Sequence, residues 1–149
     1  MAAVADAEDI AALRLFIASS FGAPADDAGY AAFDLVRALT AAGVRGYFTH
    51  FAFMTEDDVM DLRVPANGAV PETHLPIAQQ RQLVIALAMF HFMSRKAGRP
   101  FAPNLWSAAL WNAFRTKYYD PTKKIKPWNS IDDDEMKEWK KAVRINPSD

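Results

Sequence analysis

Three histidines and two runs of carboxylates are the residues of this 149-residue chain whose types could support chemistry. The histidines are His50, His74 and His91, and no two of them are four residues apart, as a helical zinc site requires. The chain contains no cysteine, which excludes a thiolate metal site, a disulfide framework and a cysteine nucleophile. We therefore expect no metal and no cofactor, and we interpret His91 as a hydrogen-bonded or half-exposed residue.

The carboxylate runs at residues 56–58 and 132–135 could suggest calcium binding or acid–base catalysis. They lack the alternating spacing of a calcium loop, and each stands where a helix is expected to begin and where the helix dipole favours negative charge. No glycine-flanked serine follows a predicted strand, so the sequence offers no nucleophile elbow. The sequence therefore predicts a protein that is not an enzyme.

The charges are divided unevenly along the chain. Residues 1–75 hold four basic and eleven acidic side chains, whereas residues 76–149 hold thirteen basic and seven acidic ones. A chain with one acidic and one basic half can bind its own copies, or it can offer the basic half to an acidic partner. The alternative is that the charges only solvate two faces of a monomer.

Aromatic and basic residues are interleaved between residues 95 and 128. Rings among cations suit single-stranded nucleic acid, because phosphates meet Lys or Arg while bases stack on the rings. The candidate phosphate contacts are Arg115, Lys117, Lys123, Lys124 and Lys126. Trp106, Trp111 and Phe114 have helical spacing, however, which favours packing in a core. Single-stranded nucleic acid is therefore the alternative partner.

One long helix is expected to position these groups. Pro76 suits the first position of a helix, and Gly98 suits the left-handed residue after its last turn. Every residue from 83 to 90 is apolar, and Phe92 follows after one histidine. A helix that is apolar nearly all round must be buried on several sides. Residues 76–98 should therefore form a spine about 30 Å long, against which shorter helices pack.

Two helices and an aromatic segment are expected before this spine. Asp6 can cap a first helix through about residue 20. Its apolar stripe has spacings of three and four and consists of Ile10, Leu13, Ile17 and Phe21. Asp26 or Asp27 can cap a second helix that stops at Gly43. Residues 44–53 then read as one or two aromatic-rich turns lodged in the core.

The remaining elements complete an all-α fold of about six helices. Thr55 can cap a short helix, residues 65–75 read as an exposed loop, a helix follows at residues 105–117, and Asp132 can cap the last one. We expect residues 1–98 to form a compact helical bundle. Residues 99–149 should form a basic, aromatic-rich extension with two helices.

Nothing in the sequence indicates a membrane partner. The longest apolar run has eight residues, far fewer than the roughly twenty that span a bilayer. Acidic residues precede the first basic one, unlike the start of a secretory signal or a transit peptide. Together with the lack of cysteine, this pattern predicts a soluble intracellular protein, cytoplasmic or nuclear.

The order of three segments between residues 33 and 97 is typical of a known kind of domain. A helix ends in LTAAGV at residues 39–44, Tyr47 and Phe51 follow, and MTEDDVMDL at residues 54–62 precedes the long helix. This order resembles the sterile alpha motif, a small five-helix interaction module, and Arg81 stands where that family often has a basic residue. The resemblance implies that residues 33–97 form a sterile-alpha-motif-like core around the long helix.

A second resemblance extends over the whole chain. The succession of LPIAQQRQL, ALAMFHFMSRKAG, FRTKYYDPTKKIKPW and DDDEMKEWKKAVRINPSD resembles the leader region of gag-type polyproteins in copia-type retrotransposons of diatoms and related algae. This resemblance implies a chain that continues into a longer polyprotein, intracellular particle assembly and proximity to nucleic acid. It assigns no active-site residues.

The first resemblance also implies how copies would associate. Modules of this type pair a surface built around the N-terminus of the long helix with an acidic middle surface on the next copy, head to tail, which leads to rings or filaments. The acidic interaction surface would consist of Glu56, Asp57, Asp58 and Asp61, and the basic one of Arg81, Arg95 and Lys96. The sequence therefore predicts a non-enzymatic module that assembles with itself or with another protein.

Overall fold

A computed structural model describes residues 4–130 of the chain. These residues form six α-helices, two short 3₁₀ helices and one two-stranded sheet. In chain order the elements are α1 (Ala7–Phe21), α2 (Asp27–Ala32), α3 (Asp34–Ala41), η1 (Phe51–Phe53), α4 (Glu56–Met60), β1 (Arg63–Val64), β2 (Thr73–His74), α5 (Ile77–Ala97), η2 (Pro103–Leu105) and α6 (Ala108–Lys117). The predicted last helix, which would start at Asp132, lies outside the described residues.

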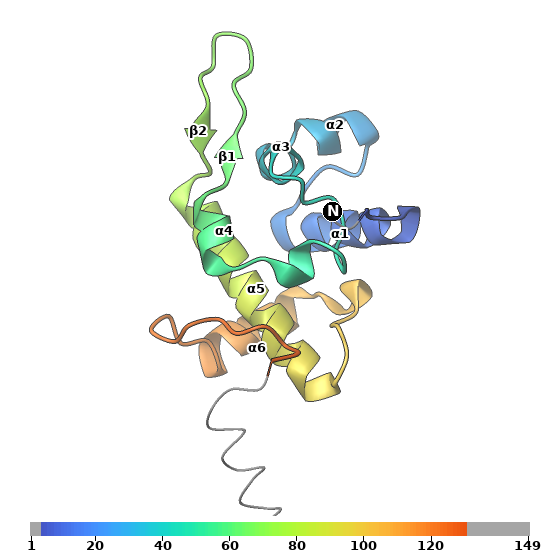
Figure 1. The fold of residues 1–149 in the computed structure, drawn as a ribbon, viewed down its shortest axis with the longest axis vertical. Coiled ribbons are helices and arrows are strands. Elements are labelled where there is room, and N and C mark those ends of the chain that lie inside the picture. The colour runs from blue at the N-terminus through green and yellow to red at the C-terminus, as the bar shows by residue number, and fades with distance from the viewer. Residues whose placement is uncertain (1–3, 131–149) are drawn as a thin grey trace, which may run out of the picture.

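The long helix α5 is the spine of the fold, as predicted. It crosses the molecule (Figure 1), α4 and η1 pack against it, and α6 packs against its C-terminal half. Pro76 precedes its first residue, and Gly98 ends it in the left-handed conformation with φ 71°. Leu83, Leu87 and Phe90 are completely buried. An apolar helix in the middle of a small domain gains its stability from burial on several sides.

Helix starts follow the predicted caps closely. The Asp6 carboxylate accepts the backbone N–H of Asp9 at 2.8 Å, which caps α1. Thr55 and Asp58 form a reciprocal capping box at the start of α4. The helix expected at residues 105–117 is shorter, because Ser107 caps it and the preceding residues form η2.

The single helix predicted between residues 27 and 43 is wrong. Phe33 is extended, with φ −65° and ψ 128°, and it separates α2 from α3. The break redirects the chain, so that α3 buries Leu35 and Leu39 in the core while α2 buries no residue. Propensity favours neither arrangement, and burial of the α3 face decides between them.

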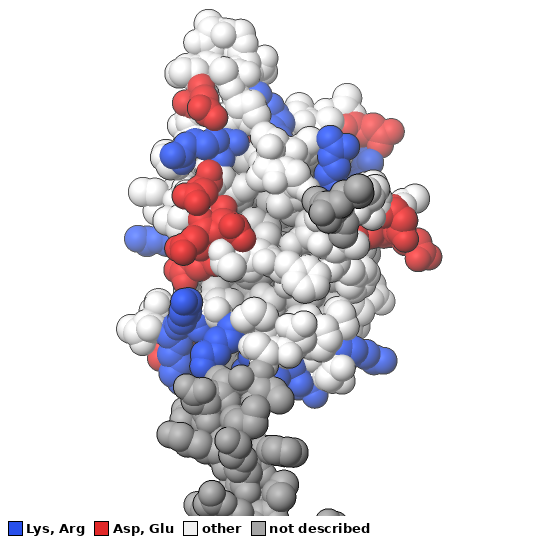
Figure 2. Space-filling view, in the orientation of Figure 1, with Lys and Arg blue, Asp and Glu red and all other residues white. Residues whose placement is uncertain are grey.

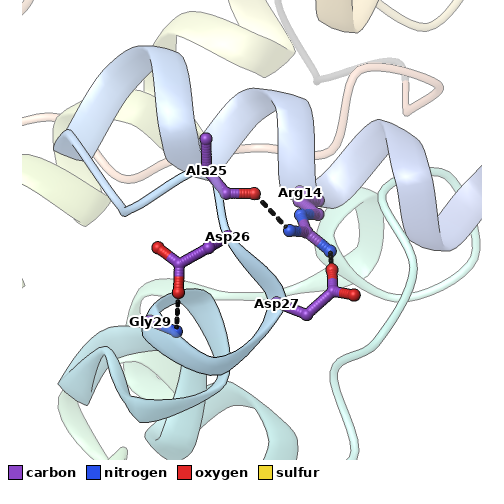
Figure 3. Close-up of polar contacts among 5 residues, drawn as sticks. All are labelled: Arg14, Ala25, Asp26, Asp27 and Gly29. Carbon is purple, nitrogen blue, oxygen red and sulfur yellow. Dashed lines mark hydrogen bonds and ion pairs between the residues drawn. The ribbon is translucent and has the colours of Figure 1, made fainter.

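Arg14 holds the short helix α2 against α1. Its guanidinium donates to the Asp27 carboxylate at 2.7 Å and to the Ala25 carbonyl at 2.6 Å (Figure 3). It also lies 4.7 Å from the centre of the Tyr30 ring. Asp26 beside it caps α2 by accepting the backbone N–H of Gly29. These three contacts of Arg14, which we call the clasp, link α2 to α1, although α2 buries no residue.

The predicted exposed loop at residues 65–75 is a β-hairpin arm, so the fold is mostly helical but not strictly all-α. Strand β1 pairs antiparallel with β2, and Asn67 and Val70 form a further bridge around Gly68. Gly68 has φ 59°, as the first position of a two-residue hairpin turn requires. The arm projects beyond the helices (Figure 1). The two central residues of the turn are Gly68 and Ala69, so Asn67-Gly68 stands one position away from the register in which Asn-Gly marks a hairpin.

An aromatic cluster forms the centre of the core. Tyr47 and Phe51 are fully buried on the segment predicted to lodge there, and their rings pack against Phe16 in tilted geometry and against Phe90 edge to face. The Tyr47 hydroxyl donates to the Phe101 carbonyl at 2.8 Å and accepts from Trp106 Nε1 at 3.0 Å. Residues beyond position 98 therefore pack into the same core as the bundle, and these residues include Phe101, Trp106 and Phe114.

A buried carboxylate joins α1 to the aromatic segment. Asp9 is 5% exposed and accepts the backbone N–H groups of Phe48 and Thr49 at 2.6 and 3.2 Å, and the Thr49 hydroxyl as well. A Cβ on Gly46 would overlap this carboxylate. The predicted stripe of α1 is therefore wrong at Ile10, which is 46% exposed, because the face that carries Asp9 turns inward.

Candidate interaction surface

A groove lies between the C-terminal half of α5, the end of α6 and the irregular segment that follows α6. Its volume is about 590 Å³. Aromatic and aliphatic side chains line it together with the ends of basic side chains. The main apolar lining residues are Phe92, Phe114, Tyr118, Tyr119 and Ile125, and the basic ones are Arg95, Lys123, Lys124 and Lys126.

Two hydrogen bonds from α5 hold the segment after α6 in place. Arg95 donates from its guanidinium to the Pro127 carbonyl at 2.9 Å. One turn earlier, His91 Nδ1 accepts the backbone N–H of Trp128 at 3.0 Å. His91 and Arg95 are four residues apart, so both face the same side of α5. The wall of the groove therefore depends on contacts between residues more than thirty positions apart.

His91 is a neutral structural acceptor. It is 4% exposed, and burial together with the nearby Arg95 charge lowers the pKa of its imidazole to about 4. A neutral ring that accepts at Nδ1 carries its proton on Nε2. This geometry agrees with the sequence interpretation of His91 as a hydrogen-bonded residue.

The four lysines Lys96, Lys123, Lys124 and Lys126 form the basic patch of the molecule, and all four are exposed. The Lys96 ammonium lies 5.0 Å from the centre of the Phe92 ring and 5.3 Å from that of Tyr118, so cation–π contacts attach it to the groove wall. Asp120 is the acid among these bases. Hydrogen bonds from Thr122 lower the pKa of its carboxyl, and Asp120 orders the turn that presents the lysines.

The four carboxylates of Glu56, Asp57, Asp58 and Asp61 form the acidic patch, and all four are exposed on or next to α4. Asp58 also serves in the capping box, and Asp61 is the C-terminal cap. Beside them a second hollow of about 560 Å³ is lined by Asp58, Asp61 and Phe53, among other residues. Phe53 is 64% exposed, so an apolar ring stands next to the acidic patch.

The two patches are neighbours on one face of the molecule. Figure 2 shows acidic side chains gathered directly above a cluster of basic ones. The rim of the groove also comes close to α4. Burial raises the pKa of Tyr119, and the negative charges of Glu56 and Asp120 raise it further, so this ring lies within electrostatic reach of the acidic patch. The face is therefore bipolar, with a negative half next to a positive half.

The predicted basic residues do not all gather in one place. Arg95 lines the groove and Lys96 belongs to the basic patch, whereas Arg81 lies fourteen residues earlier on α5. At the helical rise this separation is about 21 Å along the axis. Among the candidate nucleic-acid contacts, Lys123, Lys124 and Lys126 line the groove. Arg115 and Lys117 are exposed on the last turn of α6 and do not line it.

Sequence reasoning missed the floor and walls of the groove. Phe92 was expected only as part of a buried helix and His91 as a hydrogen-bonded or half-exposed residue, but each has a basic residue four positions later. Because residues four apart share a helix face, the pairs Phe92–Lys96 and His91–Arg95 could have indicated one basic, aromatic side of α5. Nothing local indicated that residues 118–126 would fold back onto this side.

Comparisons with known proteins identify no relative. The chain matches no protein-family model, no curated protein and no solved structure. Within residues 4–130, no group of three or more His, Asp or Glu side chains could hold a metal ion. No helix in the same part of the chain is long and apolar enough to cross a membrane.

Proposed function

We propose that this protein is a non-enzymatic interaction module that associates with its own copies through the bipolar face. The observation that carries the proposal is that the acidic patch and the basic patch are neighbours on one face (Figure 2). A surface with both signs of charge is complementary to itself, so a second copy is a natural partner. Self-association also agrees with the assembly role implied by the resemblance to sterile alpha motifs and gag-type leaders, both of which remain predictions.

The charges alone favour a weak and salt-dependent contact. An exposed ion pair contributes only about 0–1 kcal/mol, and salt near physiological strength screens charges beyond about 8 Å. Several pairs acting together with exposed aromatic rings are needed for a stable contact. Phe53 and Tyr118, which are 64% and 53% exposed, supply such rings beside the two patches. We therefore expect association at micromolar to high-micromolar protein that high salt weakens.

Light scattering after size-exclusion chromatography tests this function at several protein concentrations, in low and in high salt. We expect the mass of the wild type to rise with concentration, and Asp57→Lys to abolish that rise. Glu8→Lys is the matched control, because Glu8 is also an exposed acid in the first turn of a helix but lies outside the acidic patch. A wild type that stays monomeric under every condition would refute self-association.

Single-stranded nucleic acid is the second candidate partner, and the groove favours it. Aromatic side chains lie there among Arg95 and three lysines, as in sites where bases stack and phosphates meet cations. The neighbouring acidic patch would repel a phosphate backbone, which is why we place this function second. Reversal of Lys123, Lys124 and Lys126 to Glu should abolish retention on single-stranded nucleic acid, with affinity falling steeply as salt rises. Retention that ignores both changes would reject it.

A further inference from the structure

We propose that two copies pair face to face about a two-fold axis, with α4 of each copy seated over the basic groove of the other. This inference rests on the proposed self-association and specifies its geometry. In this arrangement the acidic patch of each copy meets the basic patch of its partner, and Phe53 beside the acidic patch inserts into the partner's groove. The complex is therefore a closed dimer.

The position of the patches decides between this geometry and a head-to-tail chain. Head-to-tail assembly requires the two complementary surfaces to face away from each other, so that each copy can contact two neighbours. Here both patches lie on one face (Figure 2), and one neighbour covers both of them. A two-fold axis in the contact plane, at right angles to the line joining the patches, places acid over base twice. The parallel alternative places like charges together and is repelled.

The charges of the two patches balance. The acidic patch has four carboxylates, and the basic patch has four ammonium groups. Arg95 and Asp120, which line the same groove, add one charge of each sign, so the dimer can satisfy both patches at once. Closure at two copies follows from the shared face, because one neighbour covers both patches.

The groove also has the shape and chemistry to receive an apolar ring. Its volume of about 590 Å³ exceeds that of a phenylalanine side chain, and Phe92, Phe114 and Ile125 supply apolar walls. Phe53 is 64% exposed and lines the hollow beside Asp58 and Asp61. Seating this ring removes its apolar surface from water, which ion pairs at the rim of an interface cannot do. The charges would orient the two copies, and Phe53 would anchor them.

Sedimentation velocity with the full chain, from low micromolar to several hundred micromolar protein, tests the geometry. We expect the mass to rise with concentration and to level off at twice the 16.6 kDa of one chain. Continued growth into larger species would refute the two-fold dimer but leave self-association standing. A mass that never exceeds the monomer would refute both.

A charge exchange between two variants tests the pairing of the patches. One variant carries Glu56→Lys with Asp57→Lys, and the other carries Lys123→Glu with Lys124→Glu. We expect each variant alone to lose the dimer, because the two substitutions cancel the net charge of one patch, so that a neutral patch faces a patch of four like charges in both contacts. An equimolar mixture should regain it, because one contact then joins an intact acidic patch to an intact basic patch, and in the other the new lysines face the new glutamates. Circular dichroism confirms that each variant is folded, and a mixture of folded variants that stays monomeric overturns the pairing.

Phe53→Ala tests the anchor separately from the charges. We expect the dissociation constant of the dimer to increase at least tenfold. Val70→Ala is the matched control, because Val70 is 62% exposed but lies at the tip of the hairpin, near Gly68 and away from both patches. It should leave the dissociation constant unchanged. Equal dissociation constants for Phe53→Ala and the wild type would overturn the seating of Phe53 in the groove.

Discussion

Acidification should destabilise this protein through His91. The folded protein lowers the pKa of this imidazole to about 4, because the ring is buried and Arg95 lies nearby. The unfolded chain has the ordinary value of about 6.5, so below that pH it binds a proton that the folded protein does not. Stability is therefore greatest above pH 6.5 and falls as the pH drops towards 4. A protonated His91 would also lose its ability to accept the Trp128 N–H.

The magnitude follows from the two pKa values. Between pH 7.5 and pH 5.0, the difference in proton binding lowers the free energy of unfolding by about 2 kcal/mol. Urea unfolding followed by tryptophan fluorescence and circular dichroism measures this free energy at each pH. Other groups titrate in the same range, so the wild type is compared with His91→Asn, whose amide oxygen can accept the same N–H without titrating.

The comparison isolates the contribution of His91. We expect the wild type to lose about 2 kcal/mol more than His91→Asn over this pH range. If His91→Asn and the wild type lost equal amounts, the buried neutral histidine and its place in the groove wall would be refuted.

Three further substitutions test the core and the clasp by urea unfolding at pH 7.5. Tyr47→Phe should lower the free energy of unfolding by about 1–3 kcal/mol, because the buried Trp106 Nε1–H loses its acceptor, and a loss near zero would contradict this bond. Gly46→Ala should cost about 2 kcal/mol or more, because the new Cβ overlaps the Asp9 carboxylate, and wild-type stability would contradict that close approach. Arg14→Ala should lower the free energy of unfolding by less than about 1 kcal/mol, because its ion pair is exposed. A larger loss would contradict the assignment of the clasp as a weak surface contact.

Tyr118→Phe is the control for the tyrosine test. Tyr118 is 53% exposed, and loss of its hydroxyl should leave the free energy of unfolding within about 0.5 kcal/mol of the wild type. Burial raises the pKa of Tyr47, so its hydroxyl stays protonated and able to donate throughout the neutral range. The difference between the two tyrosine variants therefore measures the buried hydrogen bonds of Tyr47.

The sequence by itself determined the features that depend on neighbouring residues. Asp6, Thr55 and Gly98 mark helix ends because a cap acts within one turn of the backbone. The apolar run of α5 likewise predicts a buried helix from one segment alone, because a helix that is apolar all round must be buried on several sides. The acidic residues of α4 also follow from local rules, because they occupy the first turn where the helix dipole favours them.

The tertiary structure decided everything that joins distant segments. Asp9 is buried because residues 46–49 supply donors to it, and Tyr47 finds its partners at Phe101 and Trp106. Burial of the α3 face broke the predicted helix at Phe33.

The candidate surface is likewise a product of the fold. Its lysines at residues 123–126 reach α5 only because Arg95 and His91 bind the backbone of Pro127 and Trp128, and α4 reaches the same face from an earlier part of the chain. Spacing in a sequence indicates which residues share one helix face, but it does not show which of them belong to one surface. Arg81 is on the same helix as Arg95 but lies fourteen residues earlier. Two residues on one helix can lie far apart, and two remote segments can meet, because packing of the whole core places them.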